Sequence, residues 1–279
     1  MHTPHLLLTA AAAMSLAQPV ETQRVPASAQ LTYADVADLG LAAPIAAHVR
    51  VRRADALSER EAGAVPAGHR RFLIEADLVA LIRGTDGLPA RVSYLVDVPN
   101  DERGRSARIR RGTEYLVLAT PVPGRAAELR LAARDAQLPY SADAAARLRS
   151  ILREAAAPAA APRITGIGRA FHVRGSLPGE SETQIFLQTA DNRPISLSVL
   201  RRPGEQPRWS VALGEMVDDA AETVRRDTLL WYRLACTLPQ ALPAGSLSEA
   251  SADEARAIRA DYRLVTESLG RCLRNRARG

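Results

Sequence analysis

Phe72-Leu-Ile-Glu-Ala-Asp-Leu-Val-Ala-Leu-Ile82 is the stretch that decides how the N-terminal half of this 279-residue chain folds. Its apolar residues alternate with Glu75 and Asp77, and a period of two is typical of a β-strand with one buried face. Four more strands are predicted from alternating or continuous apolar runs, over residues 45–53, 92–98, 115–119 and 128–132. Five strands so close together in the chain predict one β-rich domain.

Two helices frame these strands. Thr32 stands three positions before Asp35, the spacing of a capping box, and this predicts a short helix that Gly40 and then Pro44 stop. Ser141 is the predicted N-cap of a second helix, whose apolar residues recur at helical spacing. The first domain is therefore expected to cover residues 30–155.

An Ala/Pro-rich segment marks the predicted domain boundary. Residues 154–162 read Glu-Ala-Ala-Ala-Pro-Ala-Ala-Ala-Pro, and two prolines forbid a continuous helix. We assign the linker to 156–162 and a second domain to 163–279. This domain is predicted to hold a four-stranded antiparallel meander over 164–173, 183–189, 195–199 and 209–213, then helices over 215–223, 227–238 and 251–269. A second capping box, at Ser251 and Glu254, opens the last helix. The predicted fold class is α+β, mainly β.

The first seventeen residues predict export. They form a short apolar run that ends in Ser15-Leu16-Ala17, a small-x-small pattern typical of signal-peptide cleavage. Cleavage after Ala17 is preferred, and Ala29 ends a second small-x-small site. A helix that spans a membrane needs about twenty apolar residues, and no stretch reaches that length, so no transmembrane segment is expected. We expect a periplasmic or secreted protein; the alternative is a cytosolic protein with an N-terminal helix.

The positive charge of the chain comes entirely from arginine. The sequence has 37 basic residues, none of them lysine, 31 acidic residues and a formal net charge of +6. Arginine binds phosphate and carboxylate, so some affinity for anionic surfaces is expected. The missing lysine excludes Ser-Lys catalysis, Schiff bases and a phosphate-loop lysine. Only 4% of residues are aromatic, which argues against a stacking platform for nucleic acid.

The two cysteines, Cys236 and Cys272, are expected to form a disulfide in an oxidising compartment. Cys272 lies on the apolar stripe of the last predicted helix. Cys236 follows Leu229 and Tyr232 at helical spacing in the helix before it, so both thiols should face one interface. The alternative is two buried free cysteines.

The first domain resembles the netrin-like, OB-type barrel of the tissue inhibitors of metalloproteinases. The likeness rests on five short strands, a helix at each end, and a strand ending in Arg83-Gly84 followed by the strand Arg111-Gly-Thr-Glu-Tyr-Leu-Val117. It implies an OB-type barrel over residues 31–155. It does not imply protease inhibition, because those inhibitors reach the target zinc with an N-terminal cysteine and this domain has none.

The chain as a whole is similar to uncharacterised exported proteins of GC-rich Gram-negative bacteria. The segments that carry this resemblance are Leu31–Leu39, Asp135–Tyr140, Glu182–Leu187 and Trp231–Cys236. The resemblance implies export to the periplasm and brings no activity with it.

No catalytic, metal or cofactor site is predicted. His48, His69 and His172 are widely spaced, unlike the clustered ligands of zinc, and His48 and His172 are expected on the outward faces of their strands. Adjacent carboxylates are interpreted as solvated; these pairs are Asp101/Glu102 and Asp218/Asp219.

An arginine-rich loop between two predicted strands is the candidate anion-binding site, and on OB-type barrels such loops commonly bind ligands. Its residues are Arg103, Arg105, Arg108, Arg110 and Arg111. The alternative is a solvated loop in an arginine-rich chain. We expect a non-enzymatic binding module whose partner is an anionic envelope polymer or another protein. The competing hypothesis is a periplasmic hydrolase that uses Asp97, Asp101 and Glu182 at the domain junction.

Overall fold

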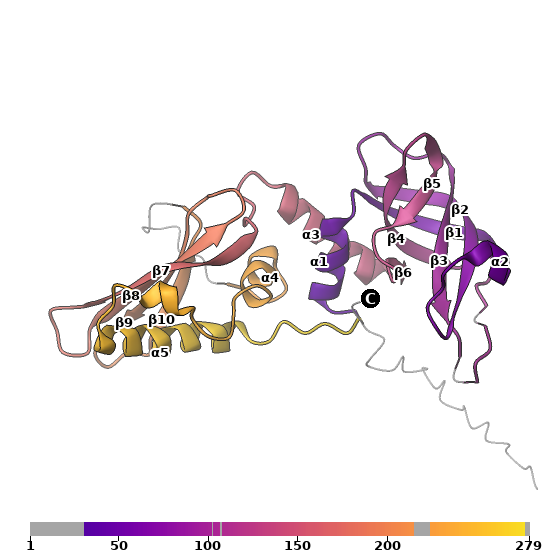
Figure 1. The fold of residues 1–279 in the computed structure, drawn as a ribbon. Helices are drawn as coiled ribbons and strands as arrows, with labels where there is room; N and C mark the ends of the chain where they lie inside the picture. Colours follow the sequence, from indigo (N-terminus) through magenta and orange to yellow (C-terminus); the bar gives the residue numbers. More distant parts are fainter. Residues whose placement is uncertain (1–30, 102, 107, 215–223, 277–279) are drawn as a thin grey trace, which may run out of the picture. The chain divides into compact units, whose positions relative to one another are not determined.

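The computed structural model describes residues 31–101, 103–106, 108–214 and 224–276 (Figure 1). The fold is mixed α and β and mostly strands, with a closed five-stranded barrel, a four-stranded antiparallel sheet and C-terminal helices. The predicted fold class is thus confirmed. The predicted leader, both candidate cleavage positions and the predicted helix over 215–223 lie outside the described residues, as do Glu102, Asp218 and Asp219.

The first sheet closes into a barrel. Its strands are β1 (Ile45–Ala56), β2 (His69–Arg83), β3 (Arg91–Pro99), β4 (Glu114–Val122), β5 (Arg125–Leu131) and the short β6 (Gln137–Pro139). The order is β1-β2-β3-β5-β4-β6, and β4 also pairs with β1, which closes the five longer strands into the OB-type barrel expected from the sequence. β3 and β5 run parallel, and the other pairs are antiparallel. The sequence pattern did not predict β6 or the four-residue helix α2 (Glu59–Ala62).

The alternating strand residues fill the barrel interior, as predicted. The buried set on β1 and β2 is Ile45, Ala47, Val49, Val51, Phe72, Ile74 and Ala76. β4 is buried on both faces, because Val117 and Ala119 point into the barrel while Leu116 and Leu118 pack outside it. A strand covered on both sides explains the continuous apolar run of its sequence.

Helices α1 (Tyr33–Ala42) and α3 (Ala142–Ala156) pack against each other and against the outer side of β4. Both predicted starts are confirmed. Thr32 and Asp35 exchange the two hydrogen bonds of a capping box, and Ser141 Oγ accepts from the Ala144 N–H at 3.1 Å. The helix ends at Ala42, between the predicted stop residues Gly40 and Pro44. Gly40 lies inside the helix, where a Cβ atom would come within 2.7 Å of Leu148 Cδ1, so its role is the close approach of α3.

The second sheet is the predicted meander. Its strands β7 (Ile164–Arg174), β8 (Ser181–Thr189), β9 (Ile195–Arg201) and β10 (Arg208–Ala212) pair in the order β10-β9-β8-β7. Three helical segments follow: α4 (Leu229–Ala235), the 3-10 helix η2 (Ala244–Leu247) and α5 (Ala252–Leu269). Helix α5 runs along the sheet and contacts β7 and β8 (Figure 1). Its Ser251/Glu254 capping box is confirmed. Helix α4 is shorter than predicted, since Thr228 caps its start and Cys236 ends it.

A second apolar cluster, outside the barrel, joins helices and sheet. It includes Leu148 of α3, Ile185 of β8, Leu234 of α4 and Ile258 of α5, all fully buried. Ala161, in the Ala/Pro-rich segment, packs against the same cluster. Helix α3 ends at Ala156 and β7 begins at Ile164, so the prolines interrupt the helix as expected. The assignment of two domains stays a prediction.

Of the two histidines expected to face outward, His48 is buried and His172 is half-buried. His48 is 6% exposed, because the Tyr140 ring stacks on it with centroids 3.7 Å apart. His172 Nδ1 lies 2.8 Å from Oγ1 of Thr183, which is fully buried. The same reason explains why the strand pattern did not indicate the contacts of these two side chains. The pattern of a single strand does not show which distant residue covers its second face.

Candidate functional site

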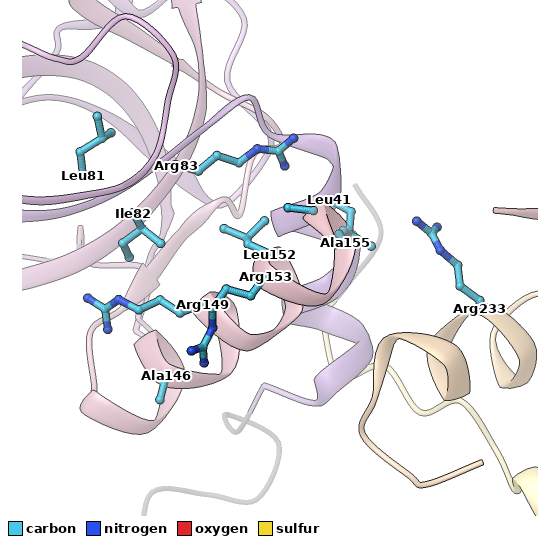
Figure 2. A pocket seen from close by; sticks show the side chains of 11 residues that line it. Leu41, Leu81, Ile82, Arg83, Ala146, Arg149, Leu152, Arg153, Ala155 and Arg233 are labelled. Atoms are coloured by element: carbon cyan, nitrogen blue, oxygen red, sulfur yellow. The ribbon is translucent and has the colours of Figure 1, made fainter. Parts of the chain in front are cut away.

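A pocket of about 830 Å³ lies between α1, α3, the end of β2 and α4 (Figure 2). Of its eleven lining residues, seven are aliphatic and four are arginines: Leu41, Leu81, Ile82, Ala146, Leu152, Ala155 and Ala156, with Arg83, Arg149, Arg153 and Arg233. The volume falls within the range of about 300–1,000 Å³ that is typical of small-molecule sites. Within the described part of the chain, no acidic side chain lines this pocket.

Helix α3 sets most of the geometry of the pocket. Arg149 and Arg153 are four residues apart on this helix, so they share one face, and Leu152 lies beside them. Figure 2 shows Leu152 and Ile82 near Arg149 and Arg153, with Arg83 above them and Arg233 apart from them on α4. Arginines from three elements therefore border an aliphatic wall.

The four arginines are not neutralised. None of them forms an ion pair with any residue that the structure describes. Arg83 Nη1 donates to the Gly40 carbonyl at 3.2 Å, and the Arg233 guanidinium lies 5.8 Å from the centre of the Tyr232 ring. Four guanidinium groups around one cavity repel one another, and a bound anion would relieve that repulsion.

Arg233 is the most unusual of the four. Its side chain is half-buried, and its Nε is buried without a hydrogen-bond partner. Burial lowers the pKa of its guanidinium, which nevertheless stays charged because arginine does not deprotonate in proteins. A buried donor without an acceptor is costly.

Three other large pockets of the described residues each include at least one acidic residue. These are Glu267 in the pocket beside the disulfide, Glu59 in the pocket beside α2, and Asp97 with Asp135 in the pocket beside β3. Among these four pockets, only the first, between α1, α3, the end of β2 and α4, has arginines and no carboxylate in its described lining. We call it the basic pocket.

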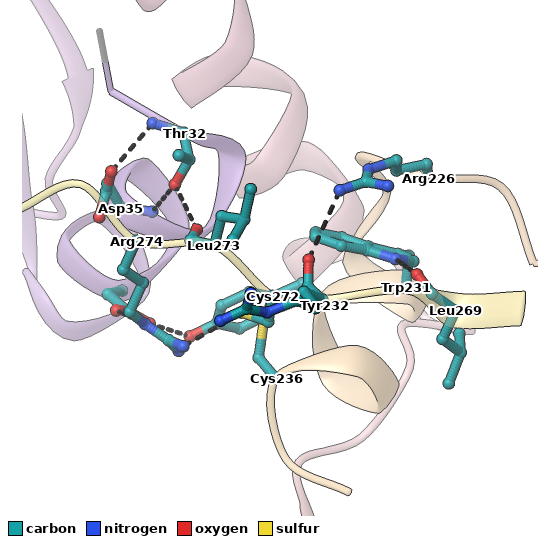
Figure 3. The surroundings of a disulfide bond; sticks show 12 residues. Thr32, Asp35, Arg226, Trp231, Tyr232, Cys236, Leu269, Cys272, Leu273 and Arg274 are labelled. Atoms are coloured by element: carbon teal, nitrogen blue, oxygen red, sulfur yellow. Dashed lines mark hydrogen bonds and ion pairs between the residues drawn. A yellow bond between two sulfur atoms is a disulfide. The ribbon is translucent and has the colours of Figure 1, made fainter. Parts of the chain in front are cut away.

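The predicted disulfide is present. Cys236, at the end of α4, and Cys272, just after α5, are joined with their Cα atoms 5.1 Å apart (Figure 3). The indole N–H of Trp231 donates to the Leu269 carbonyl at 2.9 Å beside the bridge. Helix α4 is thus attached twice to the end of α5. Cys272 lies beyond α5 itself, although the stripe pattern predicts it within the helix.

The C-terminal segment after the disulfide binds helix α1. Asp35 accepts from the backbone N–H groups of Asn275 and Arg276, and Asp38 accepts from Arg274 Nε at 2.6 Å and from the Tyr232 hydroxyl at 2.6 Å. Burial alone would raise the pKa of Asp38, but the hydrogen bonds from Arg274 and Tyr232 outweigh it and hold this pKa below its usual range. Figure 3 shows this segment between the disulfide and Thr32.

The arginine-rich loop predicted as an anion site joins β3 to β4. Arg103, Arg105, Arg108, Arg110 and Arg111 are all exposed. Arg105 pairs with Asp101 at 2.8 Å, so one of the five charges is neutralised. None of the five lines the basic pocket. The loop stays a prediction for anion binding.

The three carboxylates of the hydrolase hypothesis occupy different surroundings. Asp97, on β3, is buried and accepts two hydrogen bonds from Arg71 at 2.6 and 2.8 Å. Asp101 lies on the exposed loop, and Glu182 lies on β8 of the other sheet, where it accepts from Gln184. No two of them line one of the four large pockets of the described residues.

The described residues also bear on metal binding and on membrane spanning. They contain no group of three or more His, Cys, Asp or Glu side chains able to hold a metal ion. None of their helices has the length and apolar character that crossing a membrane requires.

Sequence reasoning missed the basic pocket. The sequence pattern places Arg149 and Arg153 on the solvent-exposed face of an amphipathic helix. The signal that could have indicated a pocket there is the adjacent Leu152, an aliphatic residue at the edge of the apolar stripe. Arg83 and Arg233 come from distant parts of the chain.

No protein-family model and no curated protein matches this chain.

Proposed function

We propose that this chain is an exported, non-enzymatic binding protein whose ligand presents an anionic group to the basic pocket. The observation that carries the proposal is the set of four arginines, unpaired within the described residues, around an aliphatic wall without any carboxylate. Such a site attracts carboxylate or phosphate through charge and through the paired donors of guanidinium.

Export is the second part of the proposal. The disulfide supports it, because such bridges form and persist in oxidising compartments such as the periplasm. The apolar run with its small-x-small site and the resemblance to exported Gram-negative proteins support it as well. An anionic envelope polymer and another protein remain the partners expected from the sequence, provided that the partner offers an anionic group.

The first prediction tests anion binding. Arg149→Gln/Arg153→Gln/Arg233→Gln should weaken binding of the anions that the wild type binds, among phosphate, butyrate and decanoate, by about tenfold or more, since each charged hydrogen bond contributes about 1.5–3 kcal/mol. Calorimetric titration of the purified, disulfide-bonded protein measures this.

The matched control removes the same charge elsewhere. Arg130→Gln/Arg202→Gln/Arg259→Gln changes three exposed arginines that line none of the four large pockets and should bind like the wild type. If no anion binds the wild type, or if both triple variants lose affinity equally, the pocket is not the site.

For export, expression in a Gram-negative host should yield a periplasmic protein whose intact mass is that of the chain after Ala17. A chain that keeps Met1 contradicts it.

A further inference from the structure

The composition of the pocket wall narrows the class of ligand. Beyond its four arginines, the described residues that line the pocket are all aliphatic. Among the residues that the structure describes, no serine, threonine, asparagine, glutamine or aromatic residue lines the pocket to recognise the hydroxyl groups of a sugar, the amides of a peptide or the ring of a nucleotide. Ligand sites place a few polar groups to match the polar groups of their ligand. Here that match is limited to a negative charge.

The aliphatic part of the wall is incompletely covered by the protein itself. Leu41, Leu81, Ile82 and Leu152 are all half-buried, and three of them pack on the edge of the apolar cluster outside the barrel. Apolar surface left open to water is unfavourable, and an apolar chain that covers it would be stabilised by about 25 cal/mol for each Å² removed from water. The wall therefore favours a ligand with a hydrocarbon part.

The arginines and the aliphatic wall together favour one class of ligand. We propose that the pocket binds a single-chain anionic amphiphile, a long-chain carboxylate, with its carboxylate at Arg149 and Arg153 and its hydrocarbon chain along Leu41, Leu81, Ile82 and Leu152. This inference rests on the proposed anion-binding function. A planar carboxylate fits the two parallel donors of a guanidinium, and the cavity of about 830 Å³ is of the size that small organic ligands occupy.

The second prediction compares ligands that differ in one part at a time, and it needs no variant. Calorimetric titration of the wild type should give the tightest binding for decanoate. Butyrate keeps the charge and shortens the chain, and it should bind at least about tenfold more weakly, since each buried methylene contributes about fourfold in affinity. Decan-1-ol keeps the chain and loses the charge, and it should also bind at least about tenfold more weakly. All ligands are used below the concentration at which they form micelles.

A charge placed inside the pocket provides the matched test on the protein. Ala146 lines the pocket and is exposed, so Ala146→Glu should fold normally and repel decanoate, with an affinity loss of about tenfold or more. Ala252→Glu adds the same charge at an exposed site on α5 outside the four large pockets, and it should leave decanoate binding unchanged. Equal affinities for the two variants would overturn the assignment to this pocket.

The ligand series separates the two proposals. Butyrate and phosphate that bind as tightly as decanoate would overturn the amphiphile and leave anion binding intact. Decyl phosphate that binds more tightly than decanoate would overturn the carboxylate head group. Failure of every anion to bind would overturn the proposed function itself.

Discussion

Asp35 shows how one residue serves two parts of the chain. Its place three residues after Thr32 predicts a cap for α1, and the structure confirms that cap. The same carboxylate, fully buried, also accepts the backbone N–H groups of Asn275 and Arg276 at 3.0 and 3.3 Å. A buried carboxylate is stable only when its oxygens accept hydrogen bonds. Two of these donors are backbone N–H groups of residues that lie 240 and 241 positions further along the chain.

Asp261 anchors helix α5 to the second sheet. It is 1% exposed and accepts from Thr183 Oγ1 at 2.5 Å and from Arg201 Nε at 2.7 Å. His172 Nδ1 reaches the same threonine hydroxyl at 2.8 Å. The threonine is fully buried, so the interpretation is a structural hydrogen-bond network that joins α5, β7, β8 and β9.

The third prediction is made at this network. Thr183→Val keeps the shape of the side chain and removes the hydroxyl that Asp261 and His172 share. We expect the free energy of unfolding to fall by about 1–3 kcal/mol, the cost of leaving a buried polar group without its partner. Urea denaturation measures the change. Thr85→Val, at an exposed loop position, is the control and should change stability little; equal effects would contradict a special role for Thr183.

At the scale of elements, the disulfide determines how the C-terminal segment is held. It joins the end of α4 to Cys272 across 36 residues, and the segment that follows carries Arg274 and Arg276 to the acidic residues of α1 and to Asp135. The apolar stripe predicts the partners of this bridge. It does not show that the residues after the bridge bind α1.

The fourth prediction removes this bridge. Cys236→Ser/Cys272→Ser should lower the free energy of unfolding by about 4 kcal/mol, because a closed loop of this length restricts the unfolded chain by that amount in the chain-entropy model. Denaturation of oxidised wild type, reduced wild type and the variant measures it. The reduced wild type should match the variant. Unchanged stability in both would show that the bridge adds nothing to the fold.

At the scale of the whole molecule, the composition limits which types of side chain can titrate at alkaline pH. The chain has no lysine, and both cysteines are bridged, so between about pH 9 and 12 the side chains that titrate are the six tyrosines. Burial raises the pKa of Tyr262 to about 12, and burial with the hydrogen bond to Asp38 raises that of Tyr232 to about 12. Burial raises the pKa of Tyr33 and Tyr94 as well.

The fifth prediction follows from these directions. A tyrosine whose pKa is higher in the folded protein than its ordinary value of about 10 stabilises the fold fully below about pH 10. That contribution is lost as the pH rises from about 10 through about 12. Circular dichroism and phenolate absorbance, recorded together, should show unfolding in this window and not below it. Ionisation of all six tyrosines while the fold persists would contradict the expected coupling.

Local patterns predicted most of the elements correctly. Alternating residues such as those of 72–82 have to place one face inside the barrel, and Thr32, Ser141 and Ser251 have to satisfy free backbone N–H groups at helix starts. These are interactions between near neighbours, so they are readable from the order of residues. The disulfide belongs with them, because a chain with two cysteines offers one intramolecular pairing.

The basic pocket, the cover over His48 and the contact of the C-terminal segment with α1 were decided only by the tertiary structure. Arg83, Arg149 and Arg233 come from three elements separated by dozens of residues, and each one alone is an ordinary surface arginine of an arginine-rich chain. Their chemistry changes because packing brings them around one cavity and removes water from Arg233. The sequence determines which surfaces each element must bury, while the mutual packing of those elements determines which charged groups remain without partners.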